Sequence, residues 1–279
     1  MIGTGRTDFE RLAGALLRLA EAAAEPILDI YRSGNLDVSY KSKDDPVTAA
    51  DKLANAQIVE GLRVLCPGVP VVAEESESSS YGDYQRSTHA FFVDPIDGTK
   101  EFVSKTDAFC TMLGMTENGR PVVGVIYCPV QRLGYVGTPH GAYAVAADGS
   151  RQALRVAAEV PLCEAIAVIS RVHRSTAVDA TLARLGLASM QPFGSAGLKA
   201  MRVAAALANM YVHSTYAGKR WDACAPEAIV VAAGGVYSDA WGCPLDYRSN
   251  NIDNSRGVLV AAPALHALAV DALAMAKFE

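Results

Sequence analysis

The sequence predicts a mixed α/β fold in which helices pack on two successive groups of strands. Three observations indicate it: a long helical periodicity near the N-terminus, a run of short strands through residues 90–147, and alternating strand and helix patterns from about residue 155. We find no internal repeat. A composition shift near residues 150–160, from polar to Val- and Ala-rich, predicts two halves, an α+β half at 1–155 and an α/β half at 156–279.

The first half should begin with helices. Residues 8–33 place apolar side chains at helical spacing, and Gly34 is a typical helix stop. We expect a short strand around 36–42 and a helix over about 48–65. The small polar residues at 76–83 predict a loop, which could act as a lid but is more simply an ordinary surface loop.

Strands dominate the rest of this half. We expect them at 106–116, 122–127, 133–138 and 141–145, and Asn118-Gly119 is the sharpest hairpin signal. In the second half, the patterns predict strands at 165–169 and 210–213. They also predict helices at 175–185, 198–208, 224–233 and 263–277.

Composition bounds the class of protein. The chain has 279 residues, 51% hydrophobic and 20% charged, with a net charge of −5, which is typical of a soluble globular protein. The acidic balance argues against binding of a nucleic-acid polymer. The N-terminus has no apolar signal core, and no apolar run reaches the ~18 residues of a membrane span. Six scattered cysteines predict buried, reduced thiols, and with them a cytoplasmic location.

The stretch at residues 90–102 carries the most specific chemical signal. An apolar strand runs into Asp94 and Asp97, and Gly98-Thr99 then precede what is expected to be a helix. The first N–H groups of a helix suit a phosphate, and carboxylates beside an anion site need a cation between them. Mg²⁺ prefers such oxygen ligands. The alternative is a plain turn, since Asp-Pro and Asp-Gly are common in turns.

Three further carboxylate segments accompany this stretch. Thr48 and Asp51 have the spacing of a capping box, so Asp51 is expected in the first helical turn, as a cap or as a catalytic group. Glu74 and Glu75 end an apolar run, where a cation would relieve their repulsion unless they are simply solvated. Asp222 precedes an apolar helical run and could be its N-cap.

Taken together, the four segments resemble the Mg²⁺-dependent, lithium-sensitive phosphatase superfamily of inositol monophosphatase. The order of an Asp at a helix start, Glu-Glu, Asp-Pro-Ile-Asp-Gly-Thr and Trp-Asp matches that pattern along nearly the whole chain. The resemblance implies a layered αβαβα sandwich with a mainly antiparallel N-terminal sheet and a smaller α/β C-terminal part. It also implies a phosphoric monoester hydrolase with two or three Mg²⁺ ions per site, most of whose ligands lie in the first half.

Residue roles follow from the same resemblance. The implied metal ligands are Glu74, Asp94, the Ile96 carbonyl, Asp97 and Asp222. Asp51 and Thr99 would position and deprotonate the attacking water. Physically, hydrolysis of a phosphate ester needs an in-line nucleophile and neutralisation of the phosphoryl oxygens, which two metal ions can supply.

Other segments resemble the 3′(2′),5′-bisphosphate nucleotidase branch. They are Lys100-Glu101-Phe102, Ser170-Arg171-Val172-His173, the Gly-rich turn from Gly194 to Lys199, and Cys224-Ala225-Pro226-Glu227. This implies conversion of adenosine 3′,5′-bisphosphate to AMP, with substrate contacts from Gly98, His173, Ser195 and Lys199. A second phosphate needs its own cation, for which Lys199 or His173 is the candidate.

Two alternatives stay open. The chain could hydrolyse inositol-1-phosphate or another sugar phosphate. It could also be a non-catalytic metal or nucleotide sensor, although a sensor would be expected to lose Thr99, Asp51 or a metal ligand, and all are present. The expected partner is a small phosphorylated substrate, and a homodimer is left open.

Overall fold

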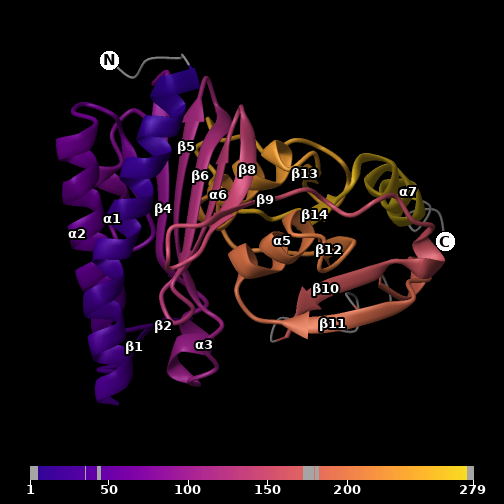
Figure 1. The fold of residues 1–279 in the computed structure, drawn as a ribbon, viewed down its shortest axis with the longest axis horizontal. Coiled ribbons are helices and arrows are strands. Elements are labelled where there is room, and N and C mark those ends of the chain that lie inside the picture. Colours follow the sequence, from indigo (N-terminus) through magenta and orange to yellow (C-terminus); the bar gives the residue numbers. More distant parts are fainter. Residues whose placement is uncertain (1–5, 35, 43–44, 172–178, 180–181, 275–279) are drawn as a thin grey trace.

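The chain folds into five stacked layers (Figure 1). The structure is a computed structural model that describes residues 6–34, 36–42, 45–171, 179 and 182–274. Helices α1 (Arg6–Ser33) and α2 (Ala49–Leu65) cover one face of a seven-stranded sheet, and α5 (Ala196–Ala204) and α6 (Trp221–Ala232) cover the other. A five-stranded sheet and α7 (Pro263–Ala274) follow. The αβαβα arrangement implied by the resemblance is therefore confirmed.

The seven-stranded sheet is antiparallel except at one edge, where β3 (Val71–Ala73) runs parallel to β4 (His89–Asp97). The order then continues through β5 (Cys110–Glu117), β6 (Arg120–Cys128), β7 (Leu133–Thr138), β8 (Gly141–Val145) and β9 (Arg151–Ala153). Asn118 and Gly119 have φ values of 53° and 75° between β5 and β6, which confirms the predicted hairpin, since a two-residue turn of type I′ requires positive φ at both.

The strand predicted from residue 106 begins four residues later. Lys105 and Asp107 adopt positive φ values of 58° and 60°, which are incompatible with extended pairing. This irregular segment follows the short helix α3 (Thr99–Val103), which begins where the helix start was expected. Two short strands, β1 (Ser39–Ser42) and β2 (Asp45–Val47), form a small separate ribbon.

The second sheet has the order β11-β10-β12-β14-β13. The strands at β10 (Ile166–Ser170) and β12 (Met210–His213) confirm two predicted segments. Three strands were missed: β11 (Ser189–Phe193), β13 (Val236–Ser238) and β14 (Val258–Ala261). β13 has only three residues, and β11 is largely exposed and contains Pro192. The helix predicted over 175–185 lies mostly outside the described residues.

Helix boundaries differ from the prediction for local reasons. The capping box of Thr48 and Asp51 at the start of α2 is present as predicted. Helix α5 ends four residues earlier than predicted, close to Ala206, whose φ is 57°. Helix α6 begins three residues earlier, so Asp222 lies inside its first turn and the N-cap is Arg220.

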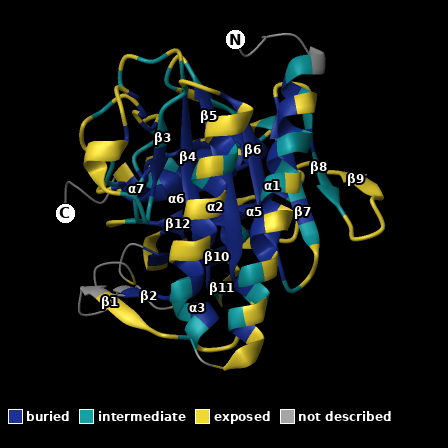
Figure 2. Cartoon of the chain, turned by 90° about the vertical axis from the view of Figure 1, so that its left-hand side faces the viewer, coloured by how far each residue is buried: buried dark blue, intermediate teal, exposed yellow. Residues whose placement is uncertain are grey.

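Burial follows the layers. The strands are mostly buried, while the outer faces of the helices and the connecting loops carry the exposed residues (Figure 2). Cys66, Cys110, Cys128 and Cys224 are buried as predicted, but Cys163 and Cys243 are exposed. The prediction was wrong for these two because each lies in a surface connection between elements. No helix in the described ranges is both long and apolar enough to cross a membrane.

Candidate active site

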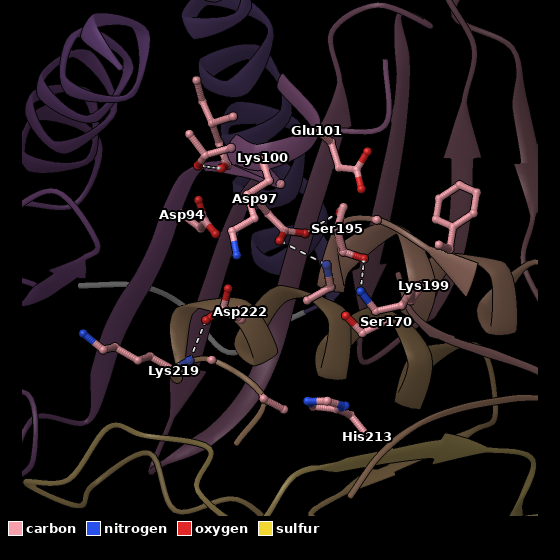
Figure 3. A pocket seen from close by; sticks show the side chains of 18 of the residues that line it. Asp94, Asp97, Lys100, Glu101, Ser170, Ser195, Lys199, His213, Lys219 and Asp222 are labelled. Carbon is pink, nitrogen blue, oxygen red and sulfur yellow. Dashed lines mark hydrogen bonds between the residues drawn. The ribbon is translucent and has the colours of Figure 1, made fainter. Parts of the chain in front are cut away.

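One pocket of about 520 Å³ collects the functional segments. It lies where the end of β4 and the start of α3 face the ends of β10 and β12 and the first turns of α5 and α6 (Figure 3). The first half of the chain therefore contributes one wall of the pocket, and the second half contributes the opposite wall. The division into halves at residues 155 and 156 stays a prediction.

Three carboxylates converge in this pocket. Asp94, Asp97 and Asp222 each offer an oxygen within 4.8 Å of the others, and their side chains point toward one another in Figure 3. Asp94 and Asp97 come from the end of β4, whereas Asp222 comes from α6. Glu74 also lines the pocket, because parallel pairing of β3 with β4 continues into a hydrogen bond from Glu74 N to Val93 O at 3.1 Å.

The electrostatics of this cluster favour a bound cation. Burial, followed by the charges of Glu74 and Asp97, raises the pKa of Asp94 well above its ordinary value. Burial and the charge of Asp97 do the same for the pKa of Asp222. Oδ1 of Asp94 is buried without a hydrogen-bond partner among the described residues. Converging hard oxygen donors with such an unsatisfied atom fit a divalent cation such as Mg²⁺.

Asp97 has a second set of contacts that the sequence did not predict. Its Oδ1 accepts a hydrogen bond from Ala196 N at 3.0 Å, and its Oδ2 accepts one from Gly197 N at 2.6 Å. The hydroxyl of Ser195 also donates to Oδ2. A carboxylate at the N-terminus of α5 is stabilised by the free N–H groups there. Asp97 thus joins the acidic cluster to the wall of the second half.

Asp51 and Thr99 lie beside each other next to the cluster. Thr48 holds Oδ2 of Asp51 through its backbone N–H at 2.8 Å and its hydroxyl at 2.6 Å. The Thr99 hydroxyl lies 3.3 Å from Oδ1 of Asp51 and 3.1 Å from the carbonyl oxygen of Ile96. Burial raises the pKa of Asp51 to about 6, against the opposing effect of the Thr48 hydrogen bonds. The Asp51 carboxylate is therefore held with Oδ1 directed at the Thr99 hydroxyl.

Three of the predicted substrate contacts lie among the described residues, Gly98 on the first wall and Ser195 and Lys199 on the opposite wall. Gly98 has a φ of 94°, and a Cβ there would lie 3.3 Å from Cβ of Ser195, so the two walls approach closely. The ammonium of Lys199 donates to Ser195 O at 2.7 Å, and burial lowers its pKa to about 8. His173 lies outside the described residues. His213, which had no predicted role, lines the pocket.

Comparison with known proteins identifies the family. A sequence model described as the inositol monophosphatase family matches residues 8–275. The chain belongs to the inositol monophosphatase family. Its members are phosphomonoesterases that use divalent metal ions, in agreement with the acidic cluster of Asp94, Asp97 and Asp222.

Several relatives of this inositol monophosphatase family member carry the same functional name. "3'(2'),5'-bisphosphate nucleotidase CysQ" of Salmonella typhimurium is 35% identical over 234 residues, covering 82% of this chain and 91% of that protein. "3'(2'),5'-bisphosphate nucleotidase 1" of Dictyostelium discoideum is 26% identical, covering 89% and 92%. A solved CysQ structure from Bacteroides thetaiotaomicron has a TM-score of 0.76 at 27% identity, covering 90% and 97%.

A solved suhB structure from Bartonella henselae has a TM-score of 0.81 at 24% identity, covering 94% of this chain and 98% of that one. At this identity, the likeness shows the inositol monophosphatase fold alone.

Sequence reasoning missed one ion pair in the pocket of this family member. Glu101 of α3 and Arg171, which follows β10, approach to 3.0 Å and both line the pocket. Their segments were singled out only as markers of a branch. No local sequence signal links two residues that are 70 positions apart, one in α3 and the other after β10.

Proposed function

We propose that this chain removes the 3′-phosphate of adenosine 3′,5′-bisphosphate and releases AMP, in a reaction that requires two or three Mg²⁺ ions. The observation that carries the proposal is the convergence of three carboxylates in one pocket that Thr99, the hydrogen-bond partner of Asp51, also lines. The nucleotide substrate is supported by the functional names of the relatives and by the segments that mark their branch.

The proposed ligands of the ions are Glu74, Asp94, the Ile96 carbonyl, Asp97 and Asp222. Bound Mg²⁺ would neutralise charge on the phosphoryl oxygens and make a water molecule more acidic. Burial, followed by the charges of neighbouring carboxylates, raises the pKa of Asp94 and of Asp222, so a bound cation would favour their ionised forms. This is why the site is suited to ions and not to a neutral ligand.

Proton transfer is assigned to Thr99 and Asp51. The attacking water would give its proton to Oγ1 of Thr99 while the Thr99 hydroxyl passes its own proton to Oδ1 of Asp51, 3.3 Å away. Thr48 fixes the other oxygen of Asp51, so Oδ1 keeps its orientation toward Thr99. A hydroxyl is a poor base alone, and the carboxylate supplies the final acceptor.

Substrate contacts are proposed for both walls. Gly98 lies on the first wall, Ser195 and Lys199 lie on the opposite wall, and His173 is proposed from its sequence context. Lys199 holds the Ser195 carbonyl and adds positive charge next to the space between the walls. A homodimer and a cytoplasmic location stay predictions.

A substrate panel tests this function. Phosphate release is measured with Mg²⁺ for adenosine 3′,5′-bisphosphate, inositol-1-phosphate, fructose-1,6-bisphosphate and histidinol phosphate. We expect the highest kcat/KM for the nucleotide. A preference for inositol-1-phosphate would overturn the nucleotide assignment. If none of the four compounds releases phosphate, the result would favour a non-catalytic sensor.

A further inference from the structure

The Glu101–Arg171 ion pair connects the two walls of the pocket away from the acidic cluster. Nη1 of Arg171 lies 3.0 Å from Oε2 of Glu101. The Glu101 side chain is 6% exposed, whereas that of Arg171 is 43% exposed. In the view of Figure 3, Glu101 lies on the other side of Asp97 from Asp94. The pair is therefore distinct from the carboxylates proposed to hold metal ions.

Glu101 is held in place by its surroundings. Its Oε2 also accepts a hydrogen bond from the Thr106 hydroxyl. On the other wall, a Cβ added to Gly194 would lie 2.2 Å from Oε1 of Glu101, so only glycine leaves room for this carboxylate. The Glu101 carboxylate therefore occupies one position, and the arginine that it binds is oriented with it.

Arg171 is suited to bind an anion in the pocket. Its backbone N–H donates to Phe193 O at 3.2 Å, which anchors the residue beyond the end of β10. Within the described part of the chain, the only side-chain hydrogen bond of Arg171 is the one from Nη1 to Glu101. A guanidinium has five N–H donors in a planar fork that matches a phosphate. Donors of Arg171 therefore remain for a ligand.

Lys199 is less accessible to a ligand than Arg171. Lys199 is only 5% exposed, and its ammonium donates to the Ser195 carbonyl of its own helix start. Contact with a substrate phosphate would require Lys199 to share or give up this bond. Arg171 offers its charge without giving up such a bond, because its side-chain hydrogen bond to Glu101 uses Nη1 alone and the planar guanidinium carries further N–H donors.

We propose that Arg171, oriented by Glu101, binds the phosphate of the nucleotide that is not hydrolysed. Arg171 is thus a specificity-determining residue, and Glu101 is a positioning residue that acts through it. This inference rests on the proposed function, because it assigns a second anion subsite to the same pocket. It also gives a physical reason for the glycine at position 194, because the absence of a side chain there leaves the space that the buried Glu101 carboxylate fills.

The test compares two nucleotides that differ by the second phosphate, adenosine 3′,5′-bisphosphate and adenosine 3′-monophosphate. Losing one charge-assisted contact in Arg171→Gln should lower kcat/KM for the bisphosphate by about 10- to 100-fold, mostly through KM, with less than about a threefold change for the monophosphate. Glu101→Gln should lower the ratio of kcat/KM for the bisphosphate to kcat/KM for the monophosphate by less than Arg171→Gln does. Arg171→Lys should keep part of this ratio, because a charge remains without the planar guanidinium.

Controls separate specificity from folding. Arg86→Gln removes an arginine that pairs with Asp83 at 3.8 Å outside this pocket, and it should leave the ratio unchanged. If Arg171→Gln does not fold, Arg171→Lys serves as the test, and its ratio must fall below that of the wild type. Equal losses for both substrates would show that the pair is only structural and overturn the inference.

Two further outcomes would also contradict the assignment of the second phosphate to Arg171. A preference that survives in Arg171→Gln but disappears in Lys199→Met would assign the second phosphate to Lys199 and overturn only this inference. A wild-type preference for inositol-1-phosphate over both nucleotides would overturn the proposed function, and this subsite with it. The wild-type panel therefore decides the function, and the ratio in the variants decides the role of Arg171.

Discussion

The hydroxyl of Thr99 lies 3.3 Å from Oδ1 of Asp51, although the two residues are 48 positions apart. Thr99 begins α3, and Asp51 lies in the first turn of α2, so two helix starts meet beside the acidic cluster. Thr48 fixes the far oxygen of Asp51 and leaves Oδ1 directed at Thr99. This pair is the part of the site that can carry a proton away from an attacking water.

Thr99→Ala should lower kcat by roughly 10²–10⁴-fold if Thr99 takes part in general-base transfer. Thr99→Ser is the matched control, because it keeps a hydroxyl, and it should retain most of the rate. Steady-state phosphate release at saturating Mg²⁺ measures both variants. Asp51→Asn should be comparably impaired, and Thr99→Ala/Asp51→Asn should be little worse than either single variant, because the residues act as a unit. An unchanged kcat in Thr99→Ala would reduce its role to the helix start.

Asp94→Asn should raise the thermal stability of the metal-free protein. Burial, followed by repulsion from Glu74 and Asp97, raises the pKa of Asp94, and a neutral amide at this position avoids both costs. In the wild type, Mg²⁺ should raise Tm by binding the folded state, and this increase should shrink in the variant. Thermal unfolding with chelator and with Mg²⁺ measures both effects. Asp271→Asn, at an exposed position of α7, is the control and should change neither value. A full Mg²⁺ response in Asp94→Asn would contradict a role for Asp94 as a ligand.

Much of the site could be predicted from sequence because its signals are local. The apolar strand before Asp94 and the capping-box spacing of Thr48 and Asp51 each fix a conformation within a few residues. Such patterns report the element on which a carboxylate lies. The order of these elements along the chain then suggested the family, which the match over residues 8–275 established.

The contacts between the two walls could not be predicted in this way. Asp97 accepts bonds from the start of α5, about 100 positions away, and Glu101 pairs with Arg171 across the pocket. Those contacts depend on how the two sheets pack around α5 and α6, which no short pattern encodes. For the same reason, the short strands β13 and β14 were missed, since their burial depends on neighbours distant in sequence.

Glu227 should make stability depend on pH. This carboxyl is 7% exposed and accepts a hydrogen bond from Tyr247 Oη at 2.7 Å, and burial raises its pKa from 4.5 to about 7. Between these values, the folded state keeps a proton that the unfolded state releases, so the free energy of unfolding falls as pH rises through the window. Above about pH 7 the Glu227 carboxyl is ionised in both states, and its contribution to the free energy of unfolding is fully lost. Below 4.5 it is protonated in both states, and the contribution is fully present.

Glu227→Gln removes this titration but keeps an oxygen for Tyr247. Relative to the wild type, the variant should gain on the order of 1–3 kcal/mol between pH 5 and pH 8. Urea unfolding at the two pH values measures the difference, with chelator present throughout. Glu60→Gln, which alters an exposed carboxylate, should show no such gain. Parallel pH profiles for the wild type and Glu227→Gln would contradict this account.

Gly194→Ala should destabilise the fold by about 1–3 kcal/mol, since the new methyl group would overlap the carboxylate of Glu101. Combining it with Glu101→Ala should relieve part of that cost, because the overlapping atoms are gone. Urea unfolding of the two single variants and the double variant gives the coupling energy. Strictly additive effects would show that Glu101 does not determine the need for glycine at this position.

The most direct test of the central claim is phosphate release from adenosine 3′,5′-bisphosphate by the wild type and by Asp94→Asn. We expect turnover by the wild type with Mg²⁺, its loss on chelation and its recovery when Mg²⁺ is restored. We also expect a folded Asp94→Asn variant without turnover at saturating Mg²⁺, because one of the three converging carboxylates is lost. Hydrolysis that persists without divalent cations, or at a near-normal rate in Asp94→Asn, would contradict the claim that this acidic cluster forms the catalytic metal site.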